Sequence, residues 1–223
     1  MRIALLLATL LSCTAPLELH HYPNTGTVQN LRYRFEPTDQ LMPYSLYVPT
    51  SYDGSKRFPV IFALHGLYSH CWQVINYPGF VDSAEKHGYI LVAPTGFNDR
   101  GWYGMYGPTH PKSEPNNLGE LSERDVLNVI TLIRDEFNID SRRIYLYGHS
   151  MGGGGAFHLL AKYPEQFAAI ATVAPAYFVE GRSTRLADSH SAILVIQGEK
   201  DRMVDVKGTR SLVEELEDNG HDV

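Results

Sequence analysis

The stretch that most constrains the fold of this chain is Gly-His-Ser-Met-Gly at residues 148–152. The mostly apolar residues before it, 143–147, are typical of a buried parallel strand, and residues 156–163 after it have the spacing of a helix. A serine between such a strand and helix sits on a sharp turn with a strained backbone, and glycines at both flanks let the two elements pass closely. The stretch therefore predicts an α/β fold with Ser150 exposed as a nucleophile. A structural glycine turn is the alternative.

Length and composition favour one domain. The chain has 223 residues, of which 43% are hydrophobic and 20% charged, and this is enough for one well-buried α/β domain but not for a second. Its formal charge of −6 is mild and no block of lysine and arginine stands out. The charge pattern therefore gives no reason to expect nucleic acid or an anionic membrane as a partner.

The N-terminus has the pattern of an export signal. Residues 1–16 combine one basic residue, a short apolar run and small residues, which predicts a secreted or cell-envelope protein whose domain covers residues 17–223. The run is too short to span a bilayer. Residues 10–13 also resemble a bacterial lipoprotein box, which would place lipid on Cys13 and give the only membrane contact. A plain signal that is cleaved nearby is an equal alternative.

A second informative site follows the apolar run at residues 59–64, which is expected to be a strand buried on both faces. The run ends in His-Gly-Leu at residues 65–67. Acyl transfer needs two backbone amides directed at the developing oxyanion, one after the nucleophile and one in the loop after such a strand. We assign these amides to Met151 and Leu67. An ordinary turn at the strand end is the alternative.

Residues 95–118 form a long loop in which glycines and prolines alternate with aromatic residues. Loops of this length are usually functional, and this one follows a predicted strand at the end where open parallel sheets bind ligands. We therefore expect Trp102 and Tyr103 to line a substrate pocket. The alternative is that these aromatic residues only cover the core. The other expected pocket residues come from the strand ends: His65, Gly66 and His149.

The remaining segments complete the pattern of alternating strands and helices. Antiparallel edge strands are expected over residues 27–36 and 43–48, helices over 80–87 and 206–219, strands over 89–94, 167–173 and 192–197, and a core-facing helix that begins with a Ser122/Asp125 capping box. The connection over residues 174–191 is short for a lid domain. An open, accessible site is therefore expected.

A candidate catalytic acid follows the last predicted strand, where residues 198–201 read Gly-Glu-Lys-Asp. Asp201 comes after the serine in chain order, and this is the order of nucleophile and acid in sites whose serine lies on a turn between a strand and a helix. Its carboxylate would accept a hydrogen bond from the Nδ1–H of a histidine and fix its tautomer. A turn-forming role is the alternative, and Asp205 is the second candidate for the acid.

The base is the residue that the sequence does not supply. Only His221 follows the acid, and the helix over residues 206–219 would return the chain to the opposite end of the sheet. A five-residue strand spans about 17 Å, far beyond hydrogen-bond reach. We therefore expect a C-terminally truncated domain that lacks its last strand and the loop with the catalytic histidine, is inactive as given, and aggregates through an uncovered sheet edge.

Taken in order, residues 65–67, 148–152 and 198–201 resemble the α/β-hydrolase superfamily, and most of all secreted bacterial esterases of the feruloyl-esterase and polyhydroxybutyrate-depolymerase type. This resemblance implies a mostly parallel central sheet with helices on both faces. It also implies cleavage of small or polymer-linked carboxylic esters through an acyl-enzyme, without metal or cofactor. In such a mechanism Ser150 attacks the ester carbonyl and Asp201 orients a histidine base.

Two other functions stay open at this point. The same scaffold serves serine peptidases of the prolyl-oligopeptidase group and non-catalytic binding proteins. An esterase is preferred because no propeller or other accessory domain is recognised that would select peptides. No metal or cofactor is expected, since the histidines lack His-x-x-x-His spacing with carboxylates and no glycine-rich phosphate loop follows a strand. The acyl group, the alcohol group and the oligomeric state are left open.

Overall fold

The computed structural model describes residues 24–109, 114–177, 186 and 189–223. The predicted signal and Cys13 lie outside these residues, and so does most of the connection before the last predicted strand. Among the helices within the described ranges, none is both long and apolar enough to cross a membrane.

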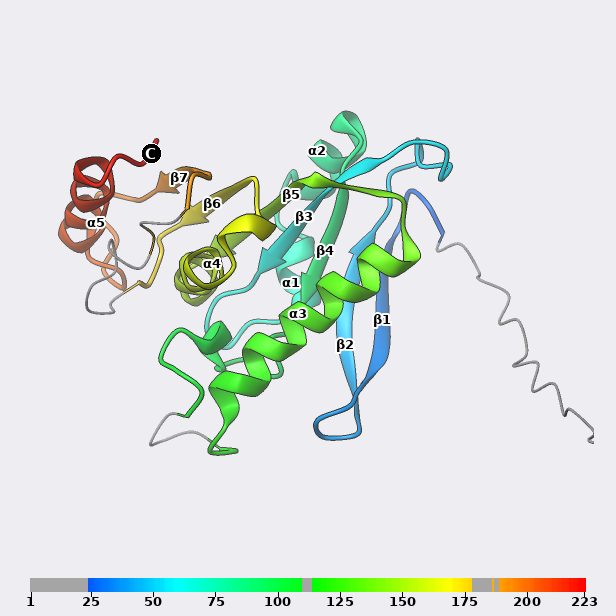
Figure 1. Cartoon of the computed structure of the whole chain (residues 1–223), viewed down its shortest axis with the longest axis horizontal. Coiled ribbons are helices and arrows are strands. Elements are labelled where there is room, and N and C mark those ends of the chain that lie inside the picture. The colour runs from blue at the N-terminus through cyan, green and yellow to red at the C-terminus, as the bar shows by residue number, and fades with distance from the viewer. Residues whose placement is uncertain (1–23, 110–113, 178–185, 187–188) are drawn as a thin grey trace, which may run out of the picture.

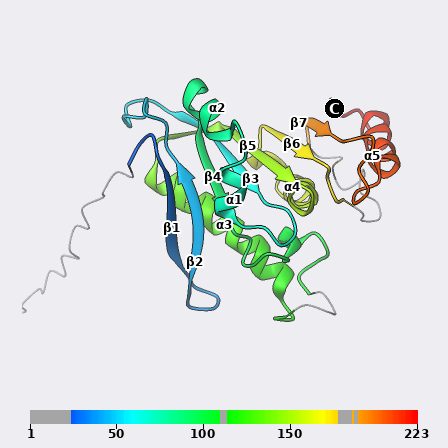
Figure 2. The same ribbon diagram turned by 180° about the vertical axis from the view of Figure 1, so that it is seen from behind.

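The core of the fold is a seven-stranded sheet in the order β1-β2-β4-β3-β5-β6-β7. The β1–β2 and β2–β4 pairs are antiparallel and the other pairs are parallel. Figures 1 and 2 show β1 and β7 at opposite ends of this sheet. The strands are β1 (Val28–Phe35), β2 (Gln40–Tyr47), β3 (Phe58–Leu64), β4 (Ile90–Pro94), β5 (Ile139–His149), β6 (Ala169–Val173) and β7 (Ala192–Ile196).

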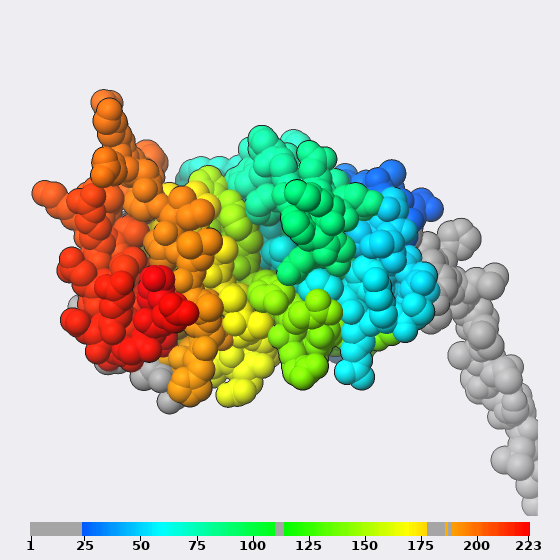
Figure 3. Space-filling view, turned by 90° about the horizontal axis from the view of Figure 1, so that it is seen from above, coloured from blue at the N-terminus to red at the C-terminus, as the bar shows by residue number. Residues whose placement is uncertain are grey.

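Helices cover the sheet on both faces. The larger core cluster joins the strands to α3, α4 and α5, whereas a second cluster joins them to α1 and α2 on the other face. Figure 3 shows α5 packed at the β7 end, away from β1. The mostly parallel sheet with helices on both faces confirms the predicted fold class. The helices are α1 (Cys71–Ile75), α2 (Phe80–His87), α3 (Leu118–Glu136), α4 (Met151–Lys162) and α5 (Val206–Asp218), with short 3-10 turns η1 (Trp102–Gly104) and η2 (Pro164–Gln166).

The prediction that the second antiparallel strand lies at a sheet edge is wrong. Strand β2 lies between β1 and β4, with Leu46 paired to Val92, so only β1 is an edge at this end. Both faces of β2 are covered, because Leu46 packs in the larger core cluster and Tyr47 in the second one. Tyr44, Leu46 and Val48 lie on one face, since all three belong to the larger cluster.

The predicted capping box is also wrong. Helix α3 begins at Leu118, so Ser122 and Asp125 lie inside the helix. Their side chains bind the preceding loop instead: the Ser122 hydroxyl accepts the Tyr103 amide at 3.1 Å, and an Asp125 carboxylate oxygen accepts the Gly96 amide at 2.7 Å. The polar residues on this helix therefore hold the long loop in place.

Strand β7 leaves apolar surface at its end of the sheet. The Leu194 side chain is 54% exposed and that of Ile196 is 51% exposed. A hollow of about 760 Å³ lies between α2 and strands β5–β7, and its walls include Phe80, Tyr147 and Leu194. Apolar surface at this edge is expected from the sequence. The aggregation that it would cause stays a prediction.

Candidate active site

Ser150 connects β5 to α4 in a strained conformation. Its φ of 54° and ψ of −115° are uncommon for any residue other than glycine. The Ser150 amide donates to the Val173 carbonyl at 2.9 Å, and its carbonyl accepts from Gly154 at 3.1 Å and Ala176 at 3.0 Å. These bonds tie the strained residue to the end of β6, to α4 and to the loop after β6. Such outliers persist only where the surroundings hold them, and they cluster at functional sites.

The two flanking glycines are required by the close approach of backbone atoms. A Cβ atom on Gly148 would lie 2.2 Å from the Gly152 carbonyl oxygen. A Cβ atom on Gly152 would lie 2.2 Å from the Leu64 carbonyl oxygen. Because these neighbours are backbone atoms, any side chain at either position would force strand and helix apart.

A Gly152→Ala variant is therefore expected to be destabilised by about 1–3 kcal/mol or more, as in other overpacked cores. The free energy of unfolding from urea titration measures the effect. Gly208→Ala is the matched control, because Gly208 lies inside α5 with no atom within 4 Å of an added Cβ. That control is expected to stabilise the protein by about 0.5–1 kcal/mol through helix propensity. Equal effects of the two substitutions would contradict the close approach at Gly152.

The loop after β3 lies against this serine. A Cβ atom on Gly66 would lie 3.5 Å from the Ser150 Cβ and 3.4 Å from the His149 Nδ1. Within the described part of the chain, neither the Leu67 amide nor the Met151 amide donates a hydrogen bond to a protein acceptor. Met151 is also the first residue of α4, so its amide lies at the helix N-terminus, where the helix dipole favours negative charge. The predicted pair of donors thus lies on two segments that meet at the serine.

His65 does not line a pocket, so this expectation is wrong. The side chain is fully buried, with Nδ1 at 2.8 Å from the Gly66 carbonyl oxygen and Nε2 at 2.8 Å from that of Thr95. Burial lowers the pKa of His65, because a charged ring would lose its hydration. The Gly66 carbonyl belongs to the same planar peptide group as the Leu67 N–H, and in a trans peptide the two point in opposite directions. In the neutral tautomer that carries its proton on Nδ1, the ring donates to the Gly66 carbonyl and so helps to orient the Leu67 amide.

His149, another predicted pocket residue, packs beneath the turn. Its Nδ1 lies 2.9 Å from the Tyr77 hydroxyl and the two ring centroids are 5.7 Å apart. Burial lowers the pKa of His149, and the negative charge of Asp201 opposes that shift. The His149 ring and the Asp201 carboxylate therefore interact electrostatically.

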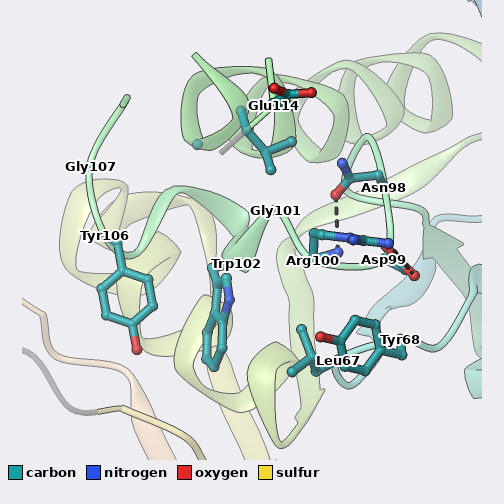
Figure 4. Close-up of a pocket in the computed structure, with 12 residues that line it drawn as sticks. Leu67, Tyr68, Asn98, Asp99, Arg100, Gly101, Trp102, Tyr106, Gly107 and Glu114 are labelled. Carbon is teal, nitrogen blue, oxygen red and sulfur yellow. Dashed lines mark hydrogen bonds and ion pairs between the residues drawn. The ribbon is translucent and has the colours of Figure 1, made fainter. Parts of the chain in front are cut away.

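A cavity of about 550 Å³ lies beside the loop that follows β3, with Leu67 in its wall (Figure 4). Trp102 and Tyr106 form an aromatic part of the wall, with ring centroids 5.1 Å apart. Trp102 therefore lines a cavity, and its contact with a substrate stays a prediction. Ser150 does not line the cavity itself, but Leu67 does, and Leu67 directly follows Gly66, which lies against the serine.

The other part of the cavity wall is charged. The Arg100 Nε donates to an Asp99 carboxylate oxygen at 2.8 Å, and this pair lowers the pKa of Asp99 (Figure 4). The Arg100 guanidinium also lies over the Tyr68 ring, 5.5 Å from its centroid. The cavity thus combines an aromatic wall with an arginine whose charge is balanced by a neighbouring carboxylate.

Tyr103 does not line the cavity, contrary to expectation. The side chain is fully buried and its hydroxyl donates to the His65 carbonyl at 3.1 Å. Its neighbour Trp102 faces the cavity while Tyr103 points into the core. Two consecutive aromatic residues of the loop therefore have opposite roles.

Asp201 follows β7 and its carboxylate is fixed by three donors. One oxygen accepts the Met203 amide at 2.8 Å and the Val204 amide at 3.0 Å, and the other accepts the Gln197 side-chain amide at 3.1 Å. The backbone hydrogen bonds lower the pKa of Asp201 below its ordinary value of 3.8. The group is thus ionised at neutral pH, as an acid that orients a histidine must be.

Asp205, the second candidate for the acid, caps α5. Its side chain accepts the Lys207 amide at 3.2 Å. An N-cap of this kind satisfies a helix amide that otherwise has no partner. The geometry therefore favours Asp201.

The described histidines do not complete a triad. The Asp222 carbonyl accepts the Ile193 amide at 3.0 Å, which places His221 beside the start of β7, whereas Asp201 follows the end of that strand. Figure 1 shows the chain end on the side of the sheet opposite to the long loop before α3. No histidine of the described residues hydrogen-bonds to Ser150 or Asp201.

A buried carboxylate on α3, which was not predicted from the sequence, supports this region. Glu123 accepts hydrogen bonds from His158 at 2.8 Å, Lys162 at 2.6 Å and Tyr163 at 2.6 Å. Burial alone would raise the pKa of Glu123, but these partners lower it to about 2. A Cβ atom on Gly104 would lie 2.7 Å from the carboxylate, so the long loop packs directly on it. Glu123 lies three residues before the core residue Val126, and this helical spacing was the available signal.

The chain is similar to several known hydrolases. S-formylglutathione hydrolase from Bos taurus is 28% identical over an alignment of 147 positions, which covers 60% of this chain and 51% of that protein. Acylamino-acid-releasing enzyme from Mus musculus is 28% identical over 68% of this chain and 19% of that protein. The structure of a ferulic acid esterase from Anaeromyces mucronatus superposes with a TM-score of 0.70 at 16% identity, over 88% of this chain and 80% of that one.

The matches show which part of the chain is shared with these proteins. The chain spans about half the length of the S-formylglutathione hydrolases that it matches. The Esterase family model matches residues 36–181, which include the loop after β3, the long loop and the turn at Ser150. The chain belongs to the Esterase family and has the α/β-hydrolase fold.

Proposed function

We propose that this protein hydrolyses carboxylic esters through an acyl-enzyme formed on Ser150. One observation carries the proposal: Ser150 is held at φ 54°, on a turn whose flanking positions accept only glycine, against the loop that bears Gly66. A strained serine exposed between strand and helix is the arrangement that serves nucleophilic attack in this fold. Membership of the Esterase family supports the same class of reaction.

The proposed chemistry uses the groups in order. The Ser150 hydroxyl oxygen attacks the ester carbonyl carbon while a histidine base takes its proton, and the carbonyl electrons move onto oxygen. The amides of Leu67 and Met151 stabilise this oxyanion. When it collapses, the alcohol leaves with the proton and the acyl group stays on the serine. A water molecule, activated by the same base, then releases the acid and restores the serine.

Asp201 is proposed to orient the base and to stabilise its charged form. Since no described histidine reaches Ser150 or Asp201, the proposal places the base outside the described residues. Export of the protein and a lipid on Cys13 also remain proposals.

The substrate is proposed to place one of its groups in the cavity beside Leu67, with Trp102 and Tyr106 against it. Relatives named S-formylglutathione hydrolase and ferulic acid esterase support an ester, small or polymer-linked, as the substrate class. The match to acylamino-acid-releasing enzyme favours a second candidate, a peptidase that uses the same serine.

A substrate panel separates these functions. The protein expressed from its complete gene is assayed with p-nitrophenyl esters of increasing acyl length and with aminoacyl p-nitroanilides. Turnover of the esters alone supports the proposal, turnover of the anilides supports the peptidase, and activity on neither indicates a binding protein. The Ser150→Ala variant is the blank in each assay.

A further inference from the structure

Tyr103 occupies a central place between the cavity and the serine. Its hydroxyl donates to the His65 carbonyl at 3.1 Å, and its ring packs edge-on against the His65 ring with centroids 5.8 Å apart. Its own amide donates to the Ser122 hydroxyl at 3.1 Å. One buried residue thus joins α3, the long loop and the loop after β3.

The surrounding backbone leaves room for this ring only because two neighbours are glycine. A Cβ atom on Gly155 of α4 would lie 2.4 Å from the Tyr103 ring, and a Cβ atom on Gly96 would lie 2.5 Å from it. Tyr103 also has a positive φ of 53°, and Trp102 before it one of 54°. Two consecutive non-glycine residues in this region are strained, and buried hydrogen bonds and packing must hold them there.

The carbonyl that Tyr103 holds lies just before the proposed oxyanion donor. His65 is fixed at its backbone by Tyr103, and its ring in turn contacts the Gly66 carbonyl at 2.8 Å. That carbonyl shares a peptide plane with the Leu67 N–H. A loss of the Tyr103 hydroxyl would therefore loosen the support of the Leu67 amide without removing any group that touches a substrate.

We propose that Tyr103 is a positioning residue that sets the direction of the Leu67 amide and couples it to the cavity wall through the adjacent Trp102. The inference rests on the proposed function, because it assigns the oxyanion to Leu67. The inference predicts that the Tyr103 hydroxyl contributes to stabilisation of the transition state and not to binding of the ester in the ground state. Hydrogen-bond donors contribute to catalysis only if they are directed at the oxyanion before the reaction.

The first test does not need activity. Hydrogen exchange measured by mass spectrometry follows the amides of Tyr68 and Ser69 in the loop after β3, which donate to the carbonyls of Asp99 in the long loop and of Gly66. In Tyr103→Phe their exchange is expected to accelerate about tenfold, the effect of losing one ordinary hydrogen bond. Tyr52→Phe is the control, because it removes another buried tyrosine hydroxyl that is hydrogen-bonded to the backbone, here as the acceptor of the Asn138 amide at 2.9 Å. Unchanged exchange at residues 68–69 in Tyr103→Phe would overturn the proposal.

The second test measures catalysis in the protein expressed from its complete gene. For p-nitrophenyl acetate, Tyr103→Phe is expected to lower kcat about tenfold with little change in KM, and to weaken a trifluoromethyl ketone inhibitor by a similar factor. Tyr52→Phe should change neither. A wild-type protein without turnover would refute the proposed function, whereas an active wild type with an equally active Tyr103→Phe variant would refute only the positioning role.

Discussion

A Ser150→Ala variant is expected to lose ester hydrolysis by about a millionfold while it keeps its fold. The loss follows because no acyl-enzyme can form without the hydroxyl oxygen. The fold should persist because alanine is no larger than serine and the turn is held by backbone bonds to Val173, Gly154 and Ala176, which the substitution leaves intact. Turnover of p-nitrophenyl acetate and labelling by a fluorophosphonate probe measure the effect, with circular dichroism as the check on folding.

Ser141→Ala is the matched control for this experiment. Ser141 is exposed near the beginning of β5, the same strand that ends before Ser150. Its replacement should leave turnover and labelling unchanged. If the probe labels Ser150→Ala as strongly as the wild type, the nucleophile is another residue and the assignment of Ser150 fails.

The turn at Ser150 could be predicted because its causes are local. The glycines at positions 148 and 152 and the apolar strand before them lie within a few residues of the serine. In the structure, a side chain at either glycine position would come within 2.5 Å of backbone atoms, so the structure requires glycine at the positions where the sequence has it. Strand order is harder to predict from the sequence. The alternation of apolar and polar residues in β2 does not show which strands it pairs with, so the prediction that it lies at an edge is wrong.

The support of the site could not be predicted because its contacts are long-range. Tyr103 reaches His65 across 38 positions, and Asp125 accepts the Tyr33 hydroxyl at 2.6 Å across 92 positions. From sequence, Ser122 and Asp125 have the spacing of a helix cap. In the structure, both side chains instead accept hydrogen bonds from backbone amides of the preceding loop. An aromatic residue in a glycine-rich loop likewise gives no sign of whether it faces the cavity, as Trp102 does, or the core.

An Asp201→Asn variant is expected to lower kcat by about ten-thousandfold with little change in folding, the effect known for the neutral amide in a serine triad. The reason lies in the donors around the carboxylate. One oxygen already accepts the amides of Met203 and Val204, so an asparagine would keep its carbonyl oxygen there. Its NH₂ group would then face the Gln197 amide and the histidine, where a second acceptor is needed. A histidine in that position would turn to the wrong tautomer.

Asp205→Asn provides the matched control, since it makes the same chemical change four residues later. Asparagine caps a helix about as well as aspartate does, so α5 and the free energy of unfolding should be unaffected. Turnover of p-nitrophenyl acetate by both variants of the protein expressed from its complete gene decides between the two carboxylates. A large loss in Asp205→Asn with normal turnover in Asp201→Asn would transfer the role of the acid to Asp205. That outcome would require the carboxylate at the N-terminus of α5 to leave the Lys207 amide and approach the turn at Ser150, and the geometry of the cap opposes this movement.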